Sequence, residues 1–209
     1  MSAVLTLVDV LRDPRVWRGT ADAVALATEP TGHALLDAAL PGQGWPQHAL
    51  SEILIPIDGI GELGLIVPTL ARLTQAEKVV VLVAPPYVAY PLAWAAQGVV
   101  MRHLHFIDAT GRDALWAAEQ CLRSGACAAV VCWPLKADDR ALRRLQVAAE
   151  TGHALGFAYR PSSTAGNPSP AATRVQLTVH ESETRLCVVK CRGGRVPTTT
   201  LTVRSRRRA

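Results

Sequence analysis

Short apolar runs and longer amphipathic stretches alternate along the chain from Leu50 onward. Continuous apolar runs rich in β-branched residues are typical of strands buried on both faces, whereas apolar residues at helical spacing are typical of helices. The alternation predicts βαβ units, and therefore an α/β fold with a mostly parallel sheet and helices on both faces. The predicted strands are residues 52–56, 79–84, 103–107, 128–133 and 154–159, and the predicted helices are residues 64–75, 90–97, 113–124 and 138–151.

The segments that flank this core have other patterns. Residues 174–181 and 184–192 alternate apolar and polar positions, which predicts an antiparallel hairpin at the edge of the sheet. Residues 4–27 show a helical apolar period, which predicts an N-terminal helical arm. A short helix is expected at residues 31–40, and the Pro- and Ser-rich residues 161–170 predict a mobile loop.

These patterns divide the chain into three parts. Residues 1–45 form the N-terminal helical arm and a Gly- and Pro-rich turn, residues 46–195 form the core, and residues 196–209 form a basic C-terminal tail. Residues 79–101 contain no charged side chain and by length could span a membrane, but Pro85, Pro86 and Pro91 argue against one continuous helix. A strand, a turn and a short helix fit this segment better. Because we recognise no secretory signal and no CxxC spacing, we expect a cytoplasmic protein with reduced thiols.

Positive charge is concentrated near the C-terminus. The chain has 22 basic and 17 acidic residues, which gives a net charge of +5. No acidic residue follows Glu183, whereas eight basic residues do, so the rest of the chain carries 14 basic and 17 acidic side chains, or −3. Such a tail commonly contacts phosphate backbones or acidic protein surfaces, although a solvated tail without a partner stays an alternative.

A glycine-rich turn between a predicted strand and a predicted helix has the frame of a phosphate-binding loop. In it, Gly59 and Gly61 lie where backbone N–H groups cradle phosphates in nucleotide-binding proteins. Such a loop needs a Lys and then a Ser or Thr, and this chain has Glu62 and Leu63 there. Because a carboxylate repels a triphosphate, we interpret the loop as degenerate and the glycine turn as retained for packing. Nucleotide binding without turnover stays an alternative.

The order of these segments resembles the ATP core of the RecA recombinase family over residues 31–179. The resemblance lies in the turn at residues 40–44, the Ser51-Glu52-Ile53 strand with its glycine loop, the helix and strand at residues 113–132, and residues 152–161. It implies a RecA-like fold. In that pattern the strand at residues 128–133 would end in a Mg²⁺-binding Asp, but Trp133 and Pro134 stand there, and we expect Asp138 and Asp139 to cap the next helix.

The other catalytic position that the resemblance implies is also vacant. The strand at residues 80–84 leads into Pro85-Pro86, where a water-activating Glu would stand. With the Lys, the metal ligand and the base missing, we expect no ATPase activity, no catalytic residue and no cofactor. His103 and His105 alternate on a predicted strand without an evident third ligand, so we expect no metal site.

A narrower resemblance is to the ImuA proteins, which are grouped with the SulA cell-division inhibitors. It is carried by five blocks in order: residues 16–19, residues 31–46, residues 59–63, residues 142–146 and residues 190–194. It implies a non-catalytic adaptor of SOS-induced, mutagenic translesion DNA synthesis. The implied partners are an ImuB-type Y-family polymerase homologue, an error-prone C-family DNA polymerase, and RecA or DNA. The alternatives are a divergent RecA-like ATPase and a SulA-like inhibitor that binds FtsZ.

The candidate contact residues are inferred from local composition and spacing, independently of the family resemblance. Trp17 beside Arg18 has the composition of an interface hot spot. Arg140 and Arg144 share a helix face that could meet a phosphate or an acidic partner, with a solvated outer face as the alternative. The basic segment near the C-terminus could bind DNA by counterion release or dock on an acidic polymerase surface; its candidates are Lys190, Arg192, Arg195, Arg206, Arg207 and Arg208.

Overall fold

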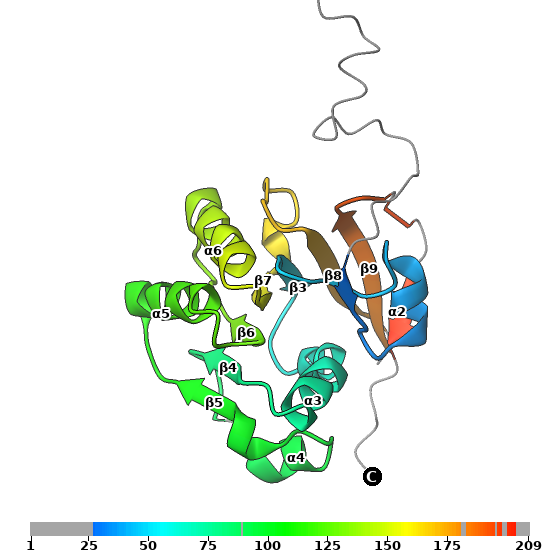
Figure 1. Ribbon diagram of the computed structural model, residues 1–209. Coiled ribbons are helices and arrows are strands. Elements are labelled where there is room, and N and C mark those ends of the chain that lie inside the picture. Colours follow the sequence, from blue (N-terminus) through cyan, green and yellow to red (C-terminus); the bar gives the residue numbers. More distant parts are fainter. Residues whose placement is uncertain (1–26, 89, 181–182, 195, 198–199, 204–209) are drawn as a thin grey trace, which may run out of the picture.

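A computed structural model describes residues 27–203 except 89, 181–182, 195 and 198–199 (Figure 1). The expected N-terminal arm, with Trp17 and Arg18, lies outside the described residues, and so do Arg195, Arg206, Arg207 and Arg208. Within the described residues, no helix is both long enough and apolar enough to cross a membrane.

The core is one sheet of eight strands in the order β10-β9-β8-β3-β7-β6-β4-β5. Neighbouring strands from β8 to β5 run parallel, whereas β8, β9 and β10 pair antiparallel. This arrangement confirms the predicted fold class: an α/β fold with a mostly parallel sheet and a C-terminal antiparallel hairpin. The strands are β3 (Leu50–Ile55), β4 (Val80–Val83), β5 (Leu104–Ile107), β6 (Ala129–Cys132), β7 (Leu155–Pro161), β8 (Thr173–His180), β9 (Glu183–Cys191) and β10 (Leu201–Val203).

Helices cover both faces of the sheet, as Figure 1 shows. Because side chains alternate along a strand, Val80 and Leu82 of β4 join one core, while Val81 and Val83 join another. The first core packs against α2 (Ala34–Ala39), α3 (Val67–Gln75) and α4 (Pro91–Ala95). The second packs against α5 (Gly111–Arg123) and α6 (Asp139–Thr151), which lie side by side.

The chain leaves two neighbouring strands toward opposite faces. After β4 it enters α4, whose Trp94 packs in the first core, and after β6 it enters α6, whose Leu142 and Leu145 pack in the second. Adjacent parallel strands whose connections diverge in this way leave a crevice at their carboxyl ends. The topology therefore places a crevice between the carboxyl ends of β4 and β6.

Several boundaries differ from the sequence-based expectation. Trp45 is fully buried against Phe157, and the short β1 (Thr28–Glu29) pairs with β2 (Trp45–Pro46), so the folded core begins before the boundary drawn at residue 45. β10 lies in the stretch assigned to the basic tail and pairs with β9, so the predicted hairpin is not at the edge of the sheet. Residues 79–101 form β4, a turn and α4, as expected.

Candidate functional site

The glycine loop joins β3 to α3 through a tight turn and one turn of 3₁₀ helix at Glu62–Leu65. Gly59 and Gly61 have φ angles of 86° and 87°, a left-handed conformation that residues with a Cβ rarely adopt. A Cβ placed on either glycine would meet no atom within 4 Å, so the backbone conformation, and not crowding, is what requires glycine at both positions. The predicted strand, glycine turn and helix are therefore all present.

Glu62 closes this loop from within. Its side chain is buried at 6% exposure, and its two carboxylate oxygens lie 3.2 and 3.1 Å from the Gly59 nitrogen, which donates to them. In a phosphate loop, backbone N–H groups of this kind would donate to a phosphate. The sequence predicts that Glu62 would repel a triphosphate, and the structure adds that the carboxylate already uses the Gly59 donor.

Two aromatic residues support the loop from the sheet. The Tyr159 hydroxyl on β7 donates to the Glu62 carbonyl oxygen at 3.0 Å, and the Trp133 ring stacks on Tyr159 with centroids 5.4 Å apart. Burial, and then the negative charge of Glu62, raise the pKa of Tyr159 well above its ordinary value. The hydroxyl therefore stays protonated and keeps donating, which holds the Glu62 backbone in place.

The positions that would supply a metal ligand and a base carry neither. β6 ends at Cys132, and burial raises the pKa of this thiol to about 12, so it is neutral at physiological pH. Asp138 accepts a hydrogen bond from the Ala141 nitrogen at 2.8 Å and caps α6, as the sequence predicts. β4 leads into Pro85 and Pro86. Among the described residues, no group of three or more His, Cys, Asp or Glu is placed to hold a metal ion.

A buried ion triad lies under the carboxyl edge of the sheet. Glu52 on β3 is fully buried, and it pairs with Arg160 at 2.8 Å and with Arg174 at 2.6 Å. Arg160 also donates to the Ala137 carbonyl at 2.7 Å, which fixes the segment after β6. Because the two guanidiniums are almost fully buried, they depend on the single carboxylate for charge compensation.

The same triad organises the segment at residues 161–170, where the sequence predicts a mobile loop. Arg174 donates to the carbonyls of Thr164, Ala165 and Asn167, each at 3.0 Å, and Lys190 donates to the Ser169 carbonyl at 2.6 Å. The structure instead shows a loop held from beneath by these two cations. Lys190, predicted as a DNA or partner contact, directs its ammonium into this loop.

The remaining candidate contacts lie on α6 and at the end of β9. Arg140 is exposed, whereas Arg144 pairs with Glu119 on α5. Arg192 pairs with Glu150 near the end of α6 at 3.5 Å, which brings the C-terminal segment beside that helix. The structure therefore brings Arg192 next to α6. Arg140 has no ion-pair partner among the described residues.

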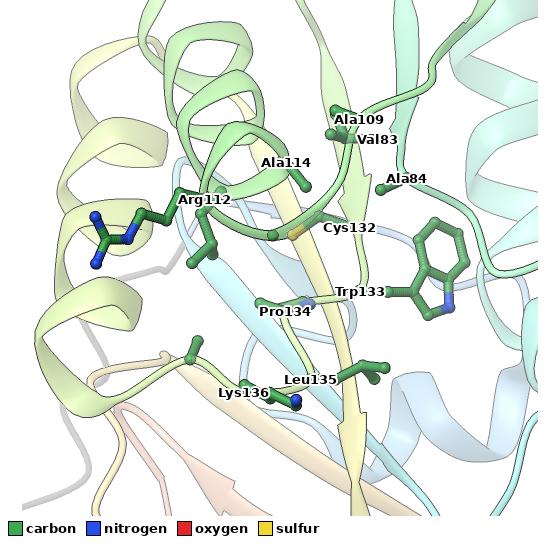
Figure 2. Close-up of a pocket in the computed structure, with 13 residues that line it drawn as sticks. Val83, Ala84, Ala109, Arg112, Ala114, Cys132, Trp133, Pro134, Leu135 and Lys136 are labelled. Carbon is green, nitrogen blue, oxygen red and sulfur yellow. The ribbon is translucent and has the colours of Figure 1, made fainter.

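The sequence did not reveal an open crevice at the same edge of the sheet as the glycine loop. It has a volume of about 500 Å³ and lies between the carboxyl ends of β4 and β6 and the start of α5, where the topology places it. Most of its lining is apolar, including Ala84, Cys132 and Pro134, and its charged side chains are Arg112 and Lys136 (Figure 2). The signal that could have located it is that the chain leaves two neighbouring strands toward opposite faces. The order of strands in the sheet cannot be predicted from the local sequence pattern, so the sequence alone did not provide this signal.

Comparisons with known proteins find likenesses among solved structures. No protein-family model matches the chain, and no curated protein matches it. A solved structure of SulA from Pseudomonas aeruginosa is 26% identical, with a TM-score of 0.44, and the match covers 53% of this chain and 97% of the SulA chain. At that TM-score the likeness carries no argument about function, so the fold assignment rests on the topology of the sheet.

Proposed function

We propose that this protein is a non-catalytic adaptor of a bacterial SOS-induced translesion DNA synthesis complex. In this proposal it links an ImuB-type Y-family polymerase homologue to an error-prone C-family polymerase and to RecA or DNA. The choice of process and partners is supported by the five sequence blocks that resemble the ImuA proteins. The non-catalytic part of the proposal has its own support in the site.

The observation that carries this part is the position of Glu62. A phosphate entering the loop would have to displace a buried carboxylate from the Gly59 N–H. It would gain no Lys, and neither β4 nor β6 is followed by a carboxylate that would hold Mg²⁺ or activate water. Because enzymes accelerate phosphoryl transfer mainly by stabilising the charge of its transition state, a site with these features favours binding functions over hydrolysis.

Identification of partners tests the adaptor function. The tagged chain would be expressed in its bacterium, the DNA damaged, the cells crosslinked briefly, and the lysate treated with nuclease before mass spectrometry. We expect enrichment of a Y-family polymerase homologue or a C-family polymerase relative to undamaged cells. Enrichment of FtsZ without these polymerases would replace the proposal with division control.

A genetic experiment tests the non-catalytic part. Deletion of the gene should lower the frequency of damage-induced mutations, and the wild-type chain should restore it. Glu62→Gln keeps the size of the side chain and an oxygen that accepts the Gly59 N–H, so it should restore mutagenesis as well. Hydrolysis of Mg²⁺-ATP by the purified wild-type chain would refute this part whatever the partners are.

A further inference from the structure

We propose that the crevice between β4 and β6 is the docking site for an acidic, apolar segment of a partner polypeptide. The inference deepens the proposed adaptor function, on which it rests, by naming a surface and the chemistry that this surface recognises. It follows from four features of the crevice: its volume, its apolar lining, its two exposed cations and its rigid rim.

The volume and lining fit large apolar side chains. The crevice holds about 500 Å³, which lies within the range of pockets that accept ligands larger than one side chain. Leu135 at its rim is 49% exposed, and a second hollow of about 330 Å³ begins where Arg112 and Leu115 border both spaces. Trp116, 61% exposed, lines that second hollow. An extended segment could therefore insert one apolar residue in the crevice and rest another on Trp116.

Charge complementarity identifies the segment as acidic. Neither Arg112 nor Lys136 has an ion-pair partner within the part of the chain that the structure describes. The nearby carboxylate of Glu119 is already paired with Arg123 at 2.7 Å and with Arg144. Figure 2 shows Lys136 on the loop that follows β6, and Arg112 extending from the start of α5 away from the other labelled lining residues. Arg112 also lines the second hollow, so carboxylates on a segment that spans both hollows would meet a cation on either element.

Arg112 is also unfavourable for its own helix. It lies in the first turn of α5, where the helix dipole favours acidic side chains; Asp113 supplies one acid there, but the N-cap residue Thr110 makes no side-chain hydrogen bond to this helix start. A carboxylate from a partner would compensate both the guanidinium and the helix N-terminus.

The rim is organised before anything binds. The Leu135 nitrogen donates to the Trp133 carbonyl at 2.9 Å, and the Ala137 nitrogen donates to the Pro134 carbonyl at 3.1 Å. Arg160 holds the Ala137 carbonyl from beneath at 2.7 Å. Binding to a preformed rim costs less ordering entropy than binding to a flexible loop.

The lining favours a polypeptide over a nucleic acid. Apart from Arg112 and Lys136, the described residues that line the crevice include no Asn, Gln, Ser or Thr side chain with which to read a base. Trp133 already stacks on Tyr159, so this indole is committed to the protein interior and is not a free platform for a base.

A random-peptide phage library panned on the purified chain tests the inference. We expect enriched sequences that combine a large apolar residue with Asp or Glu, and their synthetic versions should bind in fluorescence polarisation. Lys136→Glu and Arg112→Glu should each weaken binding about tenfold by reversing the charge. Arg112→Glu also places an acid in the first turn of α5, so loss of binding cannot be attributed to a destabilised helix.

Lys78→Glu is the matched control. Lys78 is an exposed Lys before β4, at the opposite edge of the sheet, so its reversal changes the net charge equally without touching the crevice. Equal loss of binding in Lys78→Glu and Lys136→Glu would overturn the inference, as would enrichment of sequences without acidic residues, or no enrichment. Loss of single-stranded oligonucleotide binding in the crevice variants, with peptide binding unaffected, would assign the surface to nucleic acid. If polymerases are captured in cells but no peptide is selected from the library, the docking site is refuted and the adaptor function stands. If peptides are selected but no polymerase is captured in cells, only the adaptor function is refuted.

Discussion

The glycine loop after β3 and the crevice between β4 and β6 open on the same edge of one sheet, yet their polar groups are satisfied in opposite ways. In the loop, the Gly59 N–H that would meet an anion is bonded to Glu62 of the same chain. In the crevice, Arg112 and Lys136 have no ion-pair partner among the described residues. One site is complete without a ligand, and the other is available to one.

Burial explains the difference. Glu62 is 6% exposed, and Tyr159 and Trp133 pack behind it, so its buried carboxylate depends on the Gly59 N–H as a hydrogen-bond donor. Arg112 and Lys136 are exposed, and water solvates them at little cost. A scaffold of this kind can therefore lose a ligand site by filling it with a side chain while the backbone turn stays intact. Available chemistry is then found among the exposed, unpaired groups nearby.

The largest expected effect concerns the triad beneath this edge. Glu52→Ala would leave Arg160 and Arg174 buried without a carboxylate, which should lower the free energy of unfolding by about 3–5 kcal/mol. The midpoint of urea unfolding measures this loss. Because Arg160 holds the Ala137 carbonyl, the variant should also loosen the rim of the crevice, and hydrogen exchange at the amides of residues 135–137 would detect that change.

Glu119→Ala is the matched control for this prediction. Glu119 also pairs with two arginines, but the side chains of Arg123 and Arg144 are 47% and 59% exposed, so water can replace the carboxylate. Its loss should cost only about 1 kcal/mol. Equal losses in Glu52→Ala and Glu119→Ala would mean that burial does not set the strength of these pairs.

Removal of the carboxylate from the glycine loop should produce the next largest effect. Glu62→Ala removes a hydrogen bond between the Gly59 N–H and a charged carboxylate, which should lower the free energy of unfolding by about 1.5 kcal/mol, the low end for such bonds, because Gly59 is exposed and water can take the place of the carboxylate. It should also make the loop able to bind pyrophosphate, which isothermal titration calorimetry would detect in the variant and not in the wild type. Glu62→Gln should lose less stability, because its amide oxygen still accepts from Gly59. If the wild type bound pyrophosphate as tightly as Glu62→Ala, the side chain would not be what closes this loop.

A smaller effect is expected from the support of the loop. Tyr159→Phe removes the buried donor to the Glu62 carbonyl and should lower the free energy of unfolding by about 1 kcal/mol. Thermal unfolding measures the change. Tyr87→Phe is the control, since Tyr87 is 66% exposed and should show no measurable loss. A Tyr159→Phe variant as stable as the wild type would argue that the hydrogen bond does not hold the loop.

The sequence is sufficient to predict most helices and strands, but not which of them pair or pack together. The alternation of Val80 to Val83 and of Ala129 to Cys132 between two cores follows from the period of a strand, and both strands lie within the predicted ranges. The cap by Asp138 was also predictable, because capping is local. β10 was not, because only its pairing with β9 identifies three residues as a strand.

In the candidate site, too, the local features can be predicted from the sequence and the long-range contacts cannot. The missing Lys after Gly61 and the unfavourable Glu62 are visible in the sequence, but the inward turn of the Glu62 side chain is not. Glu52, Arg160 and Arg174 are far apart in sequence, and only the pairing of β3 with β7 and β8 brings them together. Lys190 was expected at a surface contact for the same reason: its acceptor, the Ser169 carbonyl, lies in another segment.

The effect that vanishes at neutral pH concerns Cys132, which lines the crevice and is only 4% exposed. Burial raises the pKa of its thiol to about 12 from an ordinary value of 9.0, so the unfolded chain releases this proton first as the pH rises. The resulting stability is complete below pH 9.0 and is lost between pH 9.0 and about 12. Relative to Cys132→Ala, whose cavity adds a constant offset, the wild type should lose about 1 kcal/mol of the free energy of unfolding between pH 8 and pH 10. If the free energy of unfolding of the two chains changed with pH in parallel, this expectation would be contradicted. Such a result would mean that the thiol ionises in the folded chain as readily as in water, and therefore that water reaches Cys132 through the crevice.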